Sequence, residues 1–157
     1  MDASREIETG HLMRSLALAN EAKLRHWECI FVLRDPEDET VDYITSLGHK
    51  VKKLKSVDCK KIICNATTYG AWLPVSQTQD ASETASIIYD LKPDWLMVDH
   101  YALDANWFSI IEKTNTKILV IDDLGDRKLI CDLLLDQNFG ASTEKYDVKL
   151  PVNAGYS

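Results

Sequence analysis

The sequence has no long hydrophobic run, little glycine and proline, and no excess of basic charge. No apolar stretch approaches the roughly 18 to 20 residues that a membrane helix needs, and residues 1–10 lack the basic and apolar regions of a signal peptide. With 6 Gly and 4 Pro in 157 residues, the collagen-like, linker and mucin-like classes are excluded. We therefore expect a soluble, cytoplasmic protein without a membrane partner.

Acidic residues outnumber basic ones, with 25 Asp and Glu against 18 Lys and Arg and a net charge of -7. This balance argues against binding along a nucleic-acid backbone, so we expect no nucleic-acid partner. Six lysines fall between Lys50 and Lys61, a pattern that favours a solvated edge strand and loop over a phosphate-binding patch. The four cysteines form no C-x-x-C pair and have no histidines at zinc spacing, so we expect reduced thiols, no metal and no cofactor.

Strands and helices are predicted to alternate along the chain. Apolar runs bounded by polar residues or proline predict strands at 29–33, 49–54, 95–98, 117–121 and 133–135. Apolar residues at helical spacing, with capping residues, predict helices at 10–25, 36–47, 80–91 and 104–113. This alternation is typical of a Rossmann-like α/β domain, a parallel sheet covered by helices on both faces. We expect residues 1–157 to form a single domain, with the strand at 29–33 buried on both faces.

The start of the first predicted helix carries candidate functional residues. Thr9 is expected to cap this helix, which places Gly10 and His11 in its first turn, where free N–H groups and the helix dipole favour an anion such as a diphosphate. The same field disfavours a protonated His11, so its imidazole is a candidate general base that activates water; the alternative is a capping histidine without a catalytic role. Arg14 is expected to pair with a substrate phosphate or, in the simpler interpretation, with an aspartate.

Polar residues follow three of the predicted strands, and we call residues 99–101, 122–123 and 136–138 the polar rim. The carboxyl ends of parallel strands share one edge of a sheet, where ligands bind, so the rim is expected to gather there. Tyr101 is expected to donate a hydrogen bond to a sugar. Asp99 either orients a histidine or closes the strand end beside a satisfied His100. Asp122 and Asp123 suggest a metal site or an acid–base pair, but neighbours on a strand point opposite ways, so at least one should be structural.

Several motifs along the chain resemble those of one known family. They are Asp2-Ala3-Ser4, Thr9-Gly10-His11-Leu12-Met13-Arg14, Pro93-Asp94-Trp95-Leu96, Val98-Asp99-His100-Tyr101, Ile121-Asp122-Asp123-Leu124, Asp126-Arg127 and Cys131-Asp132-Leu133-Leu134-Leu135-Asp136-Gln137-Asn138. Together they resemble the amino-terminal domain of the UDP-sugar hydrolases of pseudaminic acid biosynthesis, and related spore-coat polysaccharide proteins. These hydrolases remove UDP from UDP-2,4-diacetamido-2,4,6-trideoxy-β-L-altropyranose. The resemblance covers nearly the whole chain.

The resemblance implies the amino-terminal half of a two-domain fold of the GT-B type, with the active site between the domains. It implies that His11 is the catalytic base, which deprotonates a water that attacks and inverts the anomeric carbon while UDP leaves, and that Tyr101 supports it. Because a diphosphate leaves readily, the reaction needs no paired carboxylates of the kind used in glycoside hydrolysis. The residues assigned to substrate binding are Ser4, Gly10, Arg14, Asp99, His100, Asp123, Gln137 and Asn138.

The chain departs from the family pattern in three ways. Glu8 stands where the family commonly has a glycine, the strand that should hold Asp2 is absent, and the UDP-gripping second domain lies outside the chain. We therefore expect a fragment with little or no turnover alone. Because neighbours of a missing strand keep unpaired backbone groups, we also expect dimerisation or strand exchange. Two other functions stay open, a glycosyltransferase half-domain and a non-catalytic sugar-binding or assembly module.

Overall fold

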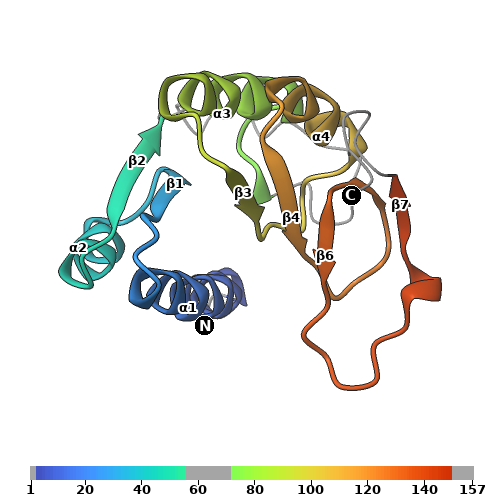
Figure 1. The fold of residues 1–157 in the computed structure, drawn as a ribbon, viewed down its shortest axis with the longest axis horizontal. Helices are drawn as coiled ribbons and strands as arrows, with labels where there is room; N and C mark the ends of the chain where they lie inside the picture. The colour runs from blue at the N-terminus through green and yellow to red at the C-terminus, as the bar shows by residue number, and fades with distance from the viewer. Residues whose placement is uncertain (1–2, 56–71, 150–157) are drawn as a thin grey trace. The chain divides into compact units, whose positions relative to one another are not determined.

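The computed structural model describes residues 3–55 and 72–149, and the chain divides into two compact units, residues 1–56 and 57–157 (Figure 1). The helices are α1 (Ala3–Leu24), α2 (Asp38–Ser46), α3 (Gln77–Leu91) and α4 (Ala105–Ile111), with short 3-10 helices η2 (Glu112–Thr114) and η3 (Thr143–Lys145). The strands are β1 (Ile30–Arg34), β2 (Lys50–Leu54), β3 (Trp95–Val98), β4 (Lys117–Ile121), β5 (Lys128–Ile130), β6 (Leu133–Leu135) and β7 (Asp147–Lys149). Within residues 3–55 and 72–149, no helix has the length and apolar character needed to cross a membrane.

Every strand pair in the described part of the chain is parallel. β1 pairs with β2 in the first unit, and the second unit contains the order β3-β4-β6 and the pair β5-β7. The prediction of a mixed α/β chain with parallel strands is thus confirmed. The described residues form small sheets of two or three strands instead of one large sheet. The single domain expected over residues 1–157 stays a prediction, because two compact units can belong to one domain.

The first helix begins earlier than predicted. α1 starts at Ala3, so Thr9 lies inside the helix and Gly10 lies about two turns from its start. The residues before Gly10 are rich in Ala, Arg and Glu, which are strong helix formers, and an interior glycine costs only about 1 kcal/mol relative to alanine. The predicted apolar face is also only partly correct, because Leu16 is buried whereas Met13 is 48% exposed.

The end of the second helix follows the prediction closely. Gly48 has a positive φ of 81°, a conformation that glycine adopts without steric cost. The N–H of Gly48 donates to the Thr45 carbonyl at 2.9 Å, and the N–H of His49 donates to the Ile44 carbonyl at 3.3 Å. These two bonds are those of a Schellman motif, which ends the helix and directs the chain into β2.

The two strands of the first unit are less enclosed than the sequence suggested. Every residue of β1 is half-buried, so the prediction of a strand buried on both faces is wrong; within the described residues, β1 pairs with β2 alone. β2 has the exposed lysines of an edge strand, as predicted, and Lys50 and Lys53 form ion pairs with Glu28 and Asp38. Lys60 and Lys61 of the lysine cluster lie outside the described residues.

The second unit is built around one apolar core. α3 and α4 lie side by side (Figure 1), and they bury side chains together with β3, β4 and β5. The core includes Ala81, Ala85, Ile88, Val98, Trp107, Phe108, Ile111, Ile118, Val120 and Leu129. The face predicted for α3 is confirmed at Ala81, Ala85 and Ile88, whereas Leu91 is 37% exposed.

Two polar contacts join α3 to α4 within this core. The indole N–H of Trp107 donates to Asp80 Oδ1 at 2.8 Å, and the backbone N–H of Asp104 donates to Gln77 Oε1 at 3.0 Å. Asp104 caps α4 as predicted, and Ser76 caps α3 by accepting from the Gln79 N–H at 3.1 Å. α3 therefore begins before the predicted Asp80, because a serine cap was available upstream.

Candidate functional site

The polar rim gathers at one edge of the β3-β4-β6 sheet, as the sequence predicted. The register pairs Val98 with Val120 and Ile121 with Leu135, so the loops that follow these strands leave the sheet together. Side chains join the loops directly. The Tyr101 hydroxyl donates to Asp123 Oδ1, and the Tyr146 hydroxyl lies 2.7 Å from the Asp122 carbonyl oxygen and 2.6 Å from Asp136 Oδ2.

Asp122 is the structural member of the adjacent aspartates. Its side chain is fully buried, and Oδ2 accepts from the backbone N–H groups of Leu124 at 3.2 Å and Gly125 at 2.9 Å. Nη2 of Arg127 lies 2.7 Å from Oδ1, close enough for a strong ion pair, although no N–H bond of the described residues is aimed at that oxygen. The prediction that at least one of Asp122 and Asp123 is structural is therefore confirmed.

Arg127 ties the loop after β3 to the loop after β4. Its Nε donates to the Leu103 carbonyl oxygen at 2.8 Å, and Nη2 donates to the His100 carbonyl oxygen at 3.4 Å. The guanidinium also lies over the Tyr101 ring, 5.8 Å from its centroid. A buried arginine that contacts two loops and a ring fixes their geometry, because its planar group presents several donors in fixed directions. Arg127 was not among the predicted site residues.

Tyr101 is held by contacts on several sides. Its ring faces Arg127 and packs against Trp72 with the ring centroids 6.0 Å apart, while its hydroxyl bonds to Asp123. A phenol has one proton, and here that proton is directed to the carboxylate, so toward a ligand the hydroxyl oxygen acts as an acceptor. The expectation that Tyr101 donates to a sugar stays a prediction.

The other rim residues differ in their surroundings. His100 is half-buried, and its Nδ1 accepts from the Ala102 N–H at 3.1 Å, which places the proton of the neutral ring on Nε2. This agrees with the alternative of a satisfied, partly buried histidine. Asp99 is also half-buried. Gln137 and Asn138 are exposed on the loop after β6, and the Asn138 N–H donates to Asp136 Oδ1 at 2.9 Å.

The loop at residues 143–146, which precedes β7, also contacts the polar rim. Lys145 Nζ lies 2.7 Å from Asp136 Oδ2, and this bond, together with those from Tyr146 and the Asn138 N–H, lowers the pKa of Asp136 to about 2. Burial, and then the bond to Asp136, raise the pKa of the Tyr146 hydroxyl. Gly125 has φ +64°, and a Cβ there would lie 2.8 Å from the Lys145 carbonyl oxygen. The loops at 122–127 and 143–146 therefore fit together only with glycine at this position.

His11 and Arg14 belong to the first unit. Nη2 of Arg14 donates to Nδ1 of His11 at 2.7 Å across one turn of α1. Because α1 begins at Ala3, Gly10 and His11 do not lie at a helix start, so the positive field of a helix N-terminus expected at these residues is wrong. The expected phosphate contact of Arg14 stays a prediction. Arg14 pairs with the imidazole, a partner that was not predicted from the sequence. The side chain of Ser4 lies outside the described residues.

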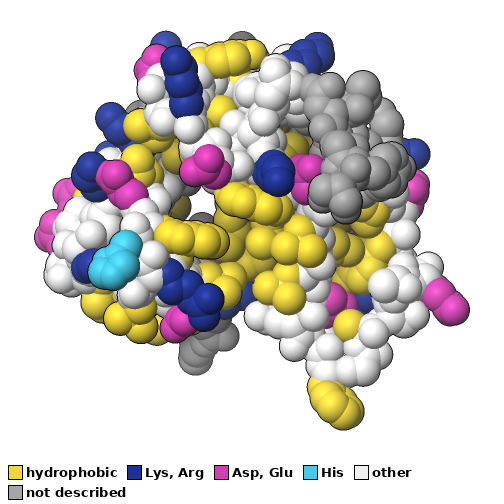
Figure 2. All heavy atoms as spheres, in the orientation of Figure 1, with side chains coloured by type: hydrophobic (Ala, Val, Ile, Leu, Met, Phe, Trp, Pro, Cys, Tyr) yellow, Lys and Arg dark blue, Asp and Glu magenta, His cyan; other side chains and the backbone are white. Residues whose placement is uncertain are grey.

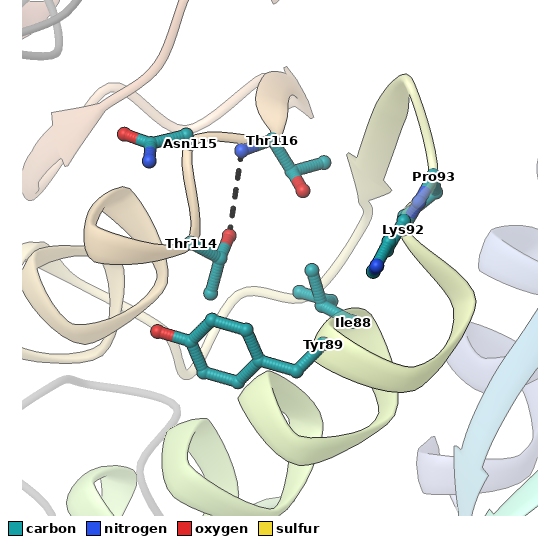
Figure 3. A pocket seen from close by; sticks show the side chains of 7 residues that line it. All are labelled: Ile88, Tyr89, Lys92, Pro93, Thr114, Asn115 and Thr116. Carbon is teal, nitrogen blue, oxygen red and sulfur yellow. Dashed lines mark hydrogen bonds between the residues drawn. The ribbon is translucent and has the colours of Figure 1, made fainter.

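One cavity of about 300 Å³ lies at the opposite end of β3 and β4, between the end of α3 and the turn before β4 (Figure 3). Lys92 and Asn115 line it, and both have a positive φ. The N–H of Thr116 donates to Thr114 Oγ1 at 3.4 Å beside it. None of the predicted site residues lines this cavity.

Two further predictions concern cysteines and metals. Cys29 and Cys131 are free thiols, and burial, with the charge of Asp132, raises the pKa of Cys131 to about 11. Cys59 and Cys64 lie outside the described residues. Across residues 3–55 and 72–149, no three His, Cys, Asp or Glu side chains form a group that could hold a metal ion.

No family model, no curated protein and no solved structure matches this chain. The resemblance of its motifs to the UDP-sugar hydrolases therefore stays a proposal.

Proposed function

We propose that this chain is the sugar-binding half of a GT-B-like nucleotide-sugar hydrolase, which releases UDP from a UDP-diacetamido-trideoxy sugar. The observation that carries the proposal is the gathering of the polar rim at the carboxyl edge of β3-β4-β6, with Tyr101 bonded to Asp123. Ligands of parallel α/β sheets bind at this edge. The motif resemblance supplies the substrate class.

The charges at the rim favour the sugar over the diphosphate. Arg127 is paired with Asp122 and Lys145 with Asp136, whereas Asp123 bonds to the neutral hydroxyl of Tyr101. A phosphate about 4 Å from a carboxylate would be repelled by roughly 4 kcal/mol at an effective dielectric constant of about 20. Sugar hydroxyl and acetamido N–H groups, in contrast, are donors that Asp123 and the Tyr101 oxygen accept.

His11 is the base in the proposed reaction. A water gives one proton to the imidazole as its oxygen forms a bond to the anomeric carbon. The bond from that carbon to the diphosphate oxygen breaks, and its electron pair leaves with UDP. The proposed role of Tyr101 and Asp123 is to hold the sugar at the rim of the second unit by accepting hydrogen bonds from it.

The test is calorimetric titration of the chain with the free diacetamido sugar, with UDP and with the UDP-sugar. We expect the sugar and the UDP-sugar to bind and UDP alone to bind much more weakly. Tyr101→Phe and Asp123→Asn should each weaken sugar binding about tenfold, the loss of one hydrogen bond to a charged or charge-assisted group. Phe139→Ser is the matched control, because Phe139 is fully exposed on the loop after β6. Sugar binding that neither rim variant changes would overturn the proposal.

UDP release in the same samples separates the chemical alternatives. Release to water that His11→Phe abolishes supports the hydrolase, and transfer to an added sugar hydroxyl indicates a glycosyltransferase. The pairing of His11 Nδ1 with Arg14 favours one further candidate, a non-catalytic sugar-binding module. Tight sugar binding without any UDP release would favour that module.

A further inference from the structure

The contact between Arg14 and His11 fixes the position of a proton. A guanidinium has only donors, so the Nη2 to Nδ1 distance of 2.7 Å requires that Nδ1 accepts and has no proton. The remaining ring proton of neutral His11 then lies on Nε2. Both residues are on α1 and are separated by one turn, so they stay neighbours without help from other elements.

This arrangement opposes the role of a general base. A base needs a lone pair directed at the water that it deprotonates. The Nδ1 lone pair is used by Arg14, and Nε2 carries the proton. His11 therefore becomes a base only when Arg14 leaves Nδ1 and exposes that lone pair.

An anionic ligand can draw Arg14 away. A guanidinium binds phosphate oxygens through two parallel charge-assisted hydrogen bonds, which are stronger than one bond to a neutral imidazole. We propose that Arg14 is the positioning residue of His11: it holds the ring proton on Nε2 in the free protein and exposes Nδ1 when its guanidinium turns to a phosphate group. The inference rests on the proposed function, in which His11 is the base beside a diphosphate.

Nitrogen NMR of the imidazole rings tests the arrangement directly, because the two ring nitrogens have different shifts with and without a proton. The chain has 4 histidines, and two of them are internal references. His49 Nε2 donates to Asn20 Oδ1 at 2.9 Å, and His100 Nδ1 accepts from the Ala102 N–H at 3.1 Å, so both have the proton on Nε2. The exposed His26 serves as a solvent-averaged reference.

In the free wild-type chain at mildly alkaline pH, the ring-nitrogen shifts of His11 should match those of His49 and His100. Arg14→Met should shift the His11 nitrogens toward those of His26, and Arg14→Lys should restore part of the wild-type pattern, because an ammonium can also donate to Nδ1. Arg25→Met is the matched control: Arg25 is exposed just beyond the end of α1 and pairs with Glu21 at 3.0 Å. It should leave His11 unchanged.

Inorganic pyrophosphate is the probe for the second half of the proposal. In the wild type it should move the His11 nitrogens in the same direction as Arg14→Met does, and in Arg14→Met it should have no further effect. A His11 signal that is identical in wild type and Arg14→Met, or unmoved by pyrophosphate, would overturn the inference. The free-protein result does not depend on any UDP-sugar. A chain that passes this test but binds no sugar would therefore refute the proposed function alone.

Discussion

The two units of this chain use the same kind of parallel pairing but enclose it to different degrees. Among the described residues, the first unit buries the apolar side chains of Leu16, Ala19, Ile44 and Leu54, whereas the second unit has a continuous cluster of 16 buried residues. Because stability follows buried apolar contact, the amides of the first unit should exchange with solvent more readily. Parallel pairing alone therefore does not make a rigid unit.

The largest expected effect comes from a matched pair of isoleucines. Ile44 and Ile111 are both 0% exposed, one in each unit. Ile111→Ala should cost about 4 kcal/mol and Ile44→Ala about 2 kcal/mol, because the cost of a cavity grows with how tightly the surrounding side chains are packed. Denaturant unfolding, monitored by hydrogen exchange of the amides in each unit, measures the two losses in stability. Equal losses would contradict the contrast between the units.

The next effect compares two glycines with positive φ. Gly125→Ala should cost about 2 to 3 kcal/mol, since the left-handed conformation alone costs roughly 1 to 2 kcal/mol for other residues. An added Cβ would also meet the Lys145 backbone. Gly48→Ala should cost about 1 kcal/mol, because its Cβ meets only the movable end of the Lys23 side chain. Thermal unfolding of both variants shows which of them loses more stability. A larger loss for Gly48→Ala would mean that the loops at 122–127 and 143–146 can separate to make room for the added Cβ.

Moderate acid should distinguish the units without a mutation. Burial, together with the charge of Lys23, lowers the pKa of His49. The stability from a neutral His49 is thus complete above its ordinary pKa of about 6.5 and is lost as the pH falls below that value. Asp136 has a lowered pKa of about 2, so its pairing with Lys145 persists above its ordinary value of 3.8 and is lost only toward pH 2.

Hydrogen exchange at pH 5 against pH 7.5 should therefore show weakened protection in the first unit alone, after correction for the intrinsic exchange rate. In His49→Gln, which keeps a donor for Asn20, the difference should disappear. Loss of protection in both units would show that His49 is not the cause.

The smallest effect concerns helix caps. Ser76 and Asp104 cap α3 and α4 through their side chains, whereas Glu37 at the start of α2 makes no such bond. Ser76→Ala should destabilise the second unit by about 1 kcal/mol, and Glu37→Ser should stabilise the first by about 0.5 kcal/mol. Urea unfolding of each variant measures the change. If Glu37→Ser raises the free energy of unfolding, part of the stability difference between the units comes from the missing cap of α2. No change would show that this cap does not contribute.

Much of the second unit could be predicted from its sequence. β3, β4 and β6 were placed at their observed residues, because each is a short apolar run that ends at polar residues. The gathering of the polar rim could be predicted from the positions of these strands, since parallel strands end at the same edge of a sheet. β5 and β7 were missed, because each has three residues and, unlike β6, contains a charged residue that interrupts the apolar run.

The remaining differences have similar causes. Arg127, Lys145 and Tyr146 were not predicted as site residues, because their partners are distant in sequence and no local pattern indicates them. The start of α1 was misplaced because Thr9 was taken as the capping residue, whereas the helix-forming residues before it extend the helix to Ala3. The hydrogen bond between Arg14 and His11 depends on that helix and was missed with it.

The loop between β6 and β7 ends in a projecting tip where a hydrophobic side chain stands out from the surface (Figure 2), and Phe139 in this loop is fully exposed. Among the aromatic residues that the structure describes, Phe139 should be the first at which a protease specific for aromatic residues cuts. The segment after the cut would stay attached, since Tyr146 bonds to Asp122 and Asp136 and β7 pairs with β5. The severed piece could then be exchanged for a synthetic peptide, which makes the second unit suitable for fragment complementation.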